Sequence, residues 1–262
     1  MKRFTLMFLV AFACFFAINQ SFSGVEGLVG LWTFDSASGN KVADESGKGH
    51  TGEMMGNAKL DTNGKFGSAL ACDGTEAYFS VPDSPDFEFS GDFTIACWIS
   101  NNTPPVDNTA FVTKGYHRPA ANGGNSKPWY MLYFLKAGSV DFFLRDTKDV
   151  NSRAVGKTLV NDGKWHHVVG VKAGNKVKIY VDGKEDGVAD AVDAVYGEND
   201  QPLVFMVHYD RWLKGLIDDV AIFNKALTED QISTIMKGSV ISAVSPKGKL
   251  ATTWSNLKIS DQ

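Results

Sequence analysis

Short β-prone segments separated by turn residues follow one another along most of this 262-residue chain. Gly, Asn and Asp supply most of the turns, since the chain holds 26 Gly and only 8 Pro. Turn signals at intervals of about 8–12 residues are typical of an antiparallel sandwich or barrel. The chain has no internal repeat of about 20–50 residues, which argues against a solenoid or propeller. The predicted strands cover residues 30–34, 69–72, 77–81, 93–99, 109–114, 129–135, 140–144, 165–171, 176–181, 203–208 and 216–223.

One short helix is predicted near the C-terminus. Thr228 can act as its N-cap and Gln231 as the capping-box partner, and isoleucines at helical spacing follow. Gly238 is placed to end the helix. We expect this helix to cover one end of the sandwich and residues 240–262 to form an extended tail.

The first 23 residues have the pattern of a secretory signal peptide. Basic Lys2 and Arg3 precede an uncharged apolar stretch, and small residues follow up to Ser23, the predicted cleavage point. The apolar stretch is about 15 residues long, shorter than the ~20 that a spanning helix needs. We therefore expect a mature chain without a transmembrane span, secreted, periplasmic or at the cell surface. An uncleaved anchor and a lipid on Cys14 are the alternatives.

Charge and cysteine content narrow the possible partners. The formal net charge is −4, and removal of Lys2 and Arg3 with the signal peptide makes it −4 − 2 = −6. No positive field would attract phosphates, so we expect no nucleic-acid partner. Cys72 and Cys97 remain after cleavage, at apolar positions of predicted strands and outside any metal-ligand spacing. We expect buried thiols, although an exported protein could also bridge them.

Ordered sequence blocks carry a family resemblance. They are Gly30-Leu31-Trp32-Thr33-Phe34-Asp35, the stretch 42–52, Phe66-Gly67-Ser68-Ala69-Leu70, Asp73-Gly74, Phe93-Thr94-Ile95, Asp162-Gly163-Lys164-Trp165-His166-His167-Val168-Val169, Tyr180-Val181-Asp182-Gly183 and the stretch 214–227. Over about residues 28–237 the chain resembles laminin-G-like domains of the concanavalin A-like jelly-roll superfamily. Cys72, where such domains often carry Phe, and Cys97 are departures.

This resemblance implies an all-β, two-sheet antiparallel jelly-roll sandwich. The resemblance also implies one domain, over residues 24–239, and a non-catalytic binding role. The short helix near the C-terminus lies within this domain.

Catalytic patterns are missing from the sequence. Similar glucanases use carboxylates two residues apart on one strand. Here Glu185-Asp186 are adjacent and follow Asp182-Gly183, which indicates a solvated hairpin tip, and Asp218-Asp219 are adjacent and point to opposite faces. The chain has no GxSxG elbow, no HExxH and no P-loop. We therefore predict no catalytic residues and no enzyme activity. A glycan-active hydrolase of this superfamily remains the alternative.

Three carboxylates make a candidate calcium site. Asp35 ends the first strand, Asp44 begins a glycine-rich loop, and Asp218 shares the face of inward-pointing apolar residues. A buried carboxylate needs a partner, and Ca²⁺ takes several oxygen ligands. A structural Ca²⁺ bridging Asp35, Asp44 and Asp218 would give the buried Asp218 carboxylate its partner. In the alternative, Asp218 accepts backbone N–H groups from the same loops.

Two polar loops hold the candidate ligand-binding residues. The long loop before Trp129 contains Tyr116 and Arg118, and long polar connections often carry function. The second loop contains Tyr209, Arg211 and Trp212, residue types that anchor interfaces. In the alternative, Trp129 and Trp212 only cap the core.

Together these patterns predict an exported binding or adhesion module for a carbohydrate or an extracellular protein surface. A structural module whose 240–262 tail docks to a partner chain is a further alternative.

Overall fold

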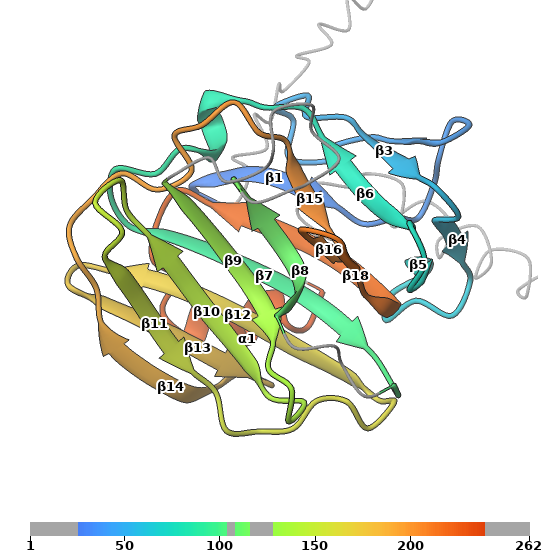
Figure 1. Cartoon of the computed structure of the whole chain (residues 1–262). Coiled ribbons are helices and arrows are strands. Elements are labelled where there is room, and N and C mark those ends of the chain that lie inside the picture. Colours follow the sequence, from blue (N-terminus) through green and yellow to red (C-terminus); the bar gives the residue numbers. More distant parts are fainter. Residues whose placement is uncertain (1–25, 104–107, 116–127, 239–262) are drawn as a thin grey trace, which may run out of the picture.

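A computed structural model describes residues 26–103, 108–115 and 128–238 of the chain (Figure 1). The predicted signal peptide, the loop residues Tyr116 and Arg118, and the predicted tail 240–262 lie outside the described residues. None of the described helices is both long enough and apolar enough to cross a membrane.

Two antiparallel sheets pack face to face, which confirms the predicted jelly-roll sandwich (Figure 1). In spatial order the first sheet contains β14 (Lys184–Asp190), β13 (Lys176–Val181), β12 (Trp165–Ala173), β7 (Phe93–Ser100), β18 (Lys214–Phe223), β5 (Ala69–Asp73) and β4 (Lys59–Asp61), with β1 (Leu28–Trp32) also paired to β18. The second sheet contains β11 (Asn151–Val155), β10 (Val140–Arg145), β9 (Trp129–Phe134), β8 (Thr109–Lys114), β15 (Leu203–Phe205), β6 (Tyr78–Val81), β3 (Gly52–Met55) and β2 (Lys41–Val42).

Aromatic side chains fill much of the space between the sheets. The Trp32 ring lies 5.2 Å from Phe205 and 6.5 Å from Phe79, centroid to centroid, in edge-to-face contacts. Its indole N–H donates to the His50 carbonyl at 2.9 Å, so the buried polar group is satisfied. Residues far apart in the sequence thereby join one core.

The predicted helix is α1 (Glu229–Ile235), and its capping box between Thr228 and Gln231 is present. It does not cover an end of the sandwich as expected. Ile232 and Ile235 pack on the outer face of the first sheet, against Ala96 and other outward apolar side chains of β1, β7, β12, β13 and β18. The physical reason is that these strands are apolar on both faces, so the outer one also needs burial. A single turn of 3-10 helix, Pro85–Phe87, follows β6.

Cys72 and Cys97 are buried and free, as the pattern of apolar positions predicted. Burial raises the pKa of the Cys72 thiol to about 12, helped by the charge of Asp73, and burial also raises the pKa of Cys97. Both groups are therefore protonated, unreactive thiols that pack as small apolar side chains.

Candidate functional site

The outer face of the second sheet is unusually apolar. β9 sends Tyr130, Leu132 and Phe134 into the core, while Trp129 and Tyr133 belong to a separate cluster on the other face. Trp129 is 5% exposed and Tyr133 2% exposed. The outer face of an antiparallel sheet normally carries polar side chains, whereas β9 carries apolar, buried side chains on both faces.

The rings on this face form one stacked group. Phe143 of β10 lies 4.8 Å from Trp129 with an interplanar angle of 18°, and Tyr133 stands edge-on to Phe143 at 6.5 Å. His208 is 6.3 Å from Trp129. Trp129 supports one side of the half-buried Phe143 ring and so fixes its orientation. We call Trp129, Tyr133, Phe143 and His208 the aromatic face.

A polar network borders the aromatic face. The Tyr133 hydroxyl donates to Asp141 Oδ2 at 2.7 Å, and Arg153 Nε donates to the same oxygen. The Arg153 guanidinium also lies 5.9 Å from the centre of the Tyr133 ring. Burial raises the pKa of Asp141, while Tyr133 and Arg153 oppose that shift. Asp141 Oδ1 is buried and has no hydrogen-bond partner among the described residues. The network joins an arginine and an acceptor oxygen to the rings.

A hairpin of β16 (Val207–His208) and β17 (Arg211–Trp212) flanks this face. Tyr209, at its turn, has a φ of 62°, and His208 Nδ1 donates to the Asn108 carbonyl at 2.7 Å. Residues paired across a ladder share a side, so Arg211 lies on the side of His208 and Trp129. Trp212 pairs with Val207 on the other side. The structure thus separates Arg211 from Trp212, which the sequence analysis had grouped.

The aromatic face itself was missed as a site. Trp129 was considered at the end of the first polar loop, with core capping as the alternative, and was not among the predicted ligand residues; Tyr133, Phe143, Asp141 and Arg153 were not singled out. The signal was the run WYMLYF of β9, six apolar or aromatic residues without alternation. Such a run indicates a strand that is buried on both faces. The sequence therefore also predicts an apolar outer face at β9.

The three carboxylates of the predicted calcium site are largely occupied by backbone donors. Asp44 accepts four hydrogen bonds, from the Leu31 and His50 N–H groups and from Ser46 N–H and Oγ. Asp218 accepts three from backbone N–H groups, as in the alternative interpretation, but the donors are Lys65, Phe66 and Asp219 and do not lie in the loops of Asp35 and Asp44. Asp35 accepts one, from Ser68 N at 3.0 Å.

N–H donors occupy much of the acceptor capacity of Asp44 and Asp218, whereas Asp35 accepts one bond, and a Ca²⁺ ion at these residues stays a prediction. Within the described ranges, no group of three or more His, Cys, Asp or Glu side chains is arranged to hold a metal ion.

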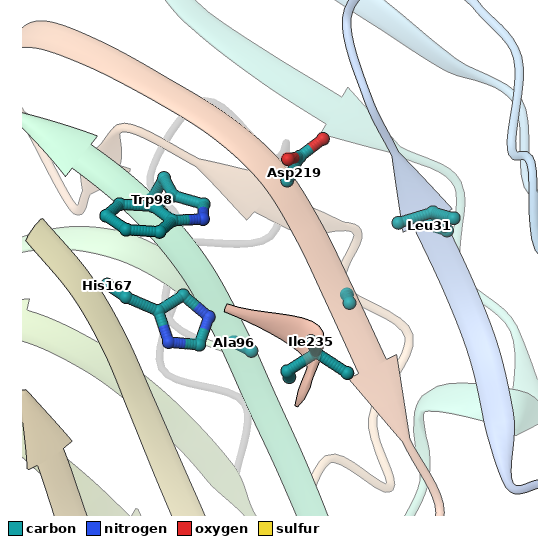
Figure 2. Close-up of a pocket in the computed structure, with 7 residues that line it drawn as sticks. Leu31, Ala96, Trp98, His167, Asp219 and Ile235 are labelled. Carbon is teal, nitrogen blue, oxygen red and sulfur yellow. The ribbon is translucent and has the colours of Figure 1, made fainter. Parts of the chain in front are cut away.

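A second polar site lies on the outer face of the first sheet, beside α1 (Figure 2). Trp98, His167 and Asp219 line a cavity with room for about one water molecule. His167 Nδ1 and Asp219 Oδ1 are buried there without hydrogen-bond partners among the described residues. Burial raises the pKa of Asp219, reinforced by Asp218, Asp35 and Glu45, and burial lowers the pKa of His167 to about 4.

Both side chains are therefore uncharged at neutral pH. The cavity is too small for an organic ligand.

The family follows from the sequence itself. Residues 73–233 match a laminin-G-like family model described as the concanavalin A-like lectin/glucanases superfamily. The chain belongs to this superfamily. No curated protein matches the chain.

Solved structures share the fold at low identity. The binding domain of Paraclostridial Mosquitocidal Protein 1 superposes with a TM-score of 0.64 at 15% identity, over 81% of this chain and 52% of that one. Domain 4 of AbnA, an extracellular arabinanase from Geobacillus stearothermophilus solved with arabinotriose, gives 0.62 at 18% identity, over 80% of this chain and 98% of that one. A botulinum neurotoxin type C structure, whose cell entry depends on two ganglioside molecules, gives 0.61 at 15% identity, over 81% and 51%. This superfamily member spans about half of each toxin chain and nearly all of the arabinanase domain.

Proposed function

We propose that this chain is an exported, non-catalytic binding module that holds a carbohydrate against the aromatic face of its second sheet. The observation that carries the proposal is the Phe143 ring, stacked on Trp129 at 4.8 Å and half-buried on the outside of the sandwich. A rigid aromatic ring offers a flat apolar surface at little cost in conformational entropy.

The surroundings of Phe143 suit a hydroxylated ligand. Arg153 faces Phe143 directly across the β10–β11 pair, and Arg211 lies on the same side of its hairpin as His208. Guanidinium groups donate several hydrogen bonds in fixed directions, which hydroxyl and carboxylate oxygens of a sugar can accept. An apolar platform with a few convergent polar groups is the usual composition of a small-molecule site.

The structural neighbours support a sugar rather than another ligand class. An arabinanase domain of the same fold was solved with arabinotriose, and cell entry of a neurotoxin, about half of whose solved chain shares this fold, depends on interaction with gangliosides. Each of these is a glycan or a glycan-bearing lipid. At 15–18% identity these neighbours share the fold, so the choice of sugar rests on this chain's own residues.

Hydrolysis is the less favoured alternative. Glycosidases place two carboxyl groups about 5–9.5 Å apart across the scissile bond. On the described outward positions of β8 to β11, Asp141 is the one carboxylate, and its Oδ2 is already shared by Tyr133 and Arg153. A passive site fits this composition better than a catalytic one.

Binding to a glycan array, followed by calorimetry on the best sugar, tests the proposal. Phe143→Ala should weaken binding by at least about tenfold. Phe66→Ala is the matched control, because Phe66 is also a half-buried phenylalanine in contact with a tryptophan, but on the first sheet.

Equal losses in both variants, or no sugar bound by the parent chain, would overturn the proposal. A protein captured by the parent chain but not by Phe143→Ala would favour adhesion. Reducing ends released from a polysaccharide would favour the hydrolase.

Export has its own test. The signal-peptide pattern predicts that the mature protein begins at Gly24. Sequencing the N-terminus of protein recovered outside the cytoplasm should give Gly-Val-Glu. Recovery of an intact Met1 in the membrane fraction would indicate the uncleaved anchor.

A further inference from the structure

Lys114, the last residue of β8, is completely buried. Its side chain is 0% exposed, which is rare for lysine because moving an ammonium group out of water is costly. Four oxygens meet at its Nζ: Asp83 Oδ1 at 2.7 Å, Asn199 O at 2.8 Å, Asn199 Oδ1 at 3.3 Å and Gln201 O at 2.8 Å. We call these four atoms the oxygen cage. It joins the end of β8 to Asp83, two residues after β6, and to the loop before β15.

The oxygen cage is held in place by contacts of its own. Asn199 Nδ2 donates to the Pro128 carbonyl at 2.7 Å, and the Gln201 N–H donates to Asn199 Oδ1 at 3.1 Å. These bonds fix which amide atom of Asn199 faces Lys114. The cage therefore keeps its oxygens pointed at one centre, and only a positive charge at that centre makes the arrangement favourable.

The local charge also calls for a cation. Besides Asp83, the carboxylates of Glu88 and Asp200 lie close enough to act on the Lys114 charge. Without the ammonium, the Asp83 carboxylate, the Asn199 amide oxygen and two backbone carbonyls would face one another without a donor, in the field of the Glu88 and Asp200 charges. A carboxylate, an amide oxygen and two backbone carbonyls are the ligand types that Ca²⁺ takes in proteins, usually with water completing six to eight ligands.

We propose that the Lys114 ammonium acts as a structural cation where the end of β8 meets Asp83 and the loop before β15. We further propose that the oxygen cage binds Ca²⁺ when the lysine side chain is shortened. Ca²⁺–oxygen distances are about 2.3–2.6 Å, so three of the oxygens have to move inward by a few tenths of an ångström, and Asn199 Oδ1, at 3.3 Å, by about 0.7–1.0 Å. The space left by the lysine side chain admits the remaining water ligands. This site shares no residue with the aromatic face, so it stands apart from the proposed function.

The contrast with Asp44 explains why the cage, and not the predicted set, has calcium chemistry. The Asp44 oxygens accept four hydrogen bonds, and the donors occupy the directions a cation would use. At the cage, three of the four oxygens point to the ammonium without another described donor, and Asn199 Oδ1 has one.

Thermal melting of three variants, each with millimolar CaCl₂, MgCl₂ or EGTA, tests the proposal. Lys114→Ala removes the charge and opens the cage, so we expect a midpoint on the order of 10 °C below the parent in EGTA. Ca²⁺ should raise that midpoint by at least about 4 °C, and Mg²⁺ by less, because Mg²⁺ requires shorter bonds and stricter geometry. The parent chain should not respond to either ion.

Lys114→Met is the matched control, because it removes the charge but still fills the cage with an apolar chain. It should be destabilised and gain nothing from Ca²⁺. Adding Asp83→Asn to Lys114→Ala removes the one carboxylate ligand and should abolish most of the calcium gain.

If Lys114→Ala does not fold in EGTA, the readout becomes the yield of refolding from urea with and without Ca²⁺. A calcium-dependent yield confined to Lys114→Ala supports the proposal. No calcium gain in Lys114→Ala, or an equal gain in Lys114→Met, overturns it.

Discussion

The two outer faces of the sandwich both carry apolar side chains, but different parts of the chain lie against them. Both carry apolar side chains where an antiparallel sheet often meets water. On the first sheet, Ile232 and Ile235 of α1 cover those side chains, and Lys65 lies 4.1 Å above the Trp98 ring. On the second sheet, the rings are bordered by Arg153 and by the β16–β17 hairpin. An apolar face closed by the chain's own helix contributes to stability, whereas one bordered by fixed cationic groups suits recognition.

The largest effect should come from uncovering the first face. Ile232 is 0% exposed, and Ile232→Ala should cost about 2–5 kcal/mol of unfolding free energy through lost burial and a cavity. Urea unfolding measures this loss. Sugar binding by the folded variant should be unchanged, and a parallel loss of binding would break the division between the two faces.

Removing the half-buried Phe143 ring of the second face should have the opposite pattern. Phe143→Ala should weaken sugar binding by at least about tenfold, while costing less unfolding free energy than Ile232→Ala because Phe143 is only half-buried. Calorimetry and urea unfolding on the same preparations give both numbers. A variant that loses stability but keeps its affinity would assign the ring to the core instead.

The hairpin offers a finer test within the second face. Arg211→Ala should weaken binding by about three- to tenfold, because Arg211 shares the side of His208 and Trp129. Trp212→Ala should stay within about twofold of the parent, since Trp212 is on the opposite side. The reverse ranking would place the ligand on the Val207 side of the hairpin.

The buried Asp219 in the cavity beside α1 should make the unfolding free energy depend on pH. Asp219 is raised in pKa to about 9 by burial and by the neighbouring carboxylates, so the folded chain keeps a proton that the unfolded chain releases near its ordinary pKa of 3.8. The contribution of Asp219 to stability is therefore present below about pH 4 and is lost as the pH rises towards 9. Asp219→Asn should gain on the parent across that interval, in urea unfolding at pH 5 and pH 9. The asparagine also tolerates the φ of 47° at this position. A difference that does not change with pH would show that Asp219 ionises normally.

The smallest effect should be that of a chelator on the parent chain. Since the carboxylates of Asp35, Asp44 and Asp218 accept hydrogen bonds, EGTA should shift the melting midpoint by less than about 1 °C. A clear fall in the midpoint would restore the calcium prediction at these residues.

The sandwich was predictable because its central strands are long and strongly β-prone. β7 and the β12–β13 hairpin were found at nearly their full lengths. The strands that the sequence analysis left out are short or polar and lie at or near sheet edges, such as β11 with the sequence NSRAV and β14 with KEDGVAD. An edge strand pairs on one side only and keeps many side chains in water, so its composition resembles that of a loop.

The candidate site was less predictable, because the pairing register of neighbouring strands decides which of its residues come together. Phe143 and Arg153 are ten positions apart in the sequence and become direct neighbours only through the β10–β11 pairing. Arg211 and Trp212 are adjacent in the sequence but lie on opposite sides of the hairpin, because Arg211 pairs with His208 and Trp212 with Val207. Residue type suggested Tyr209, Arg211 and Trp212, but which side of a two-residue strand each one occupies depends on the pairing of the hairpin.

Lys114 gives the rim where β6, β8 and the loop before β15 meet a positive charge that is covalently attached to the chain. A bound ion exchanges with the medium, so its occupancy follows the concentration outside and falls when a competitor removes it. A tethered ammonium cannot diffuse away: every folded molecule carries the side chain, in dilute or ion-poor surroundings alike. Three segments of this molecule are thereby joined in a way that a chelator cannot undo.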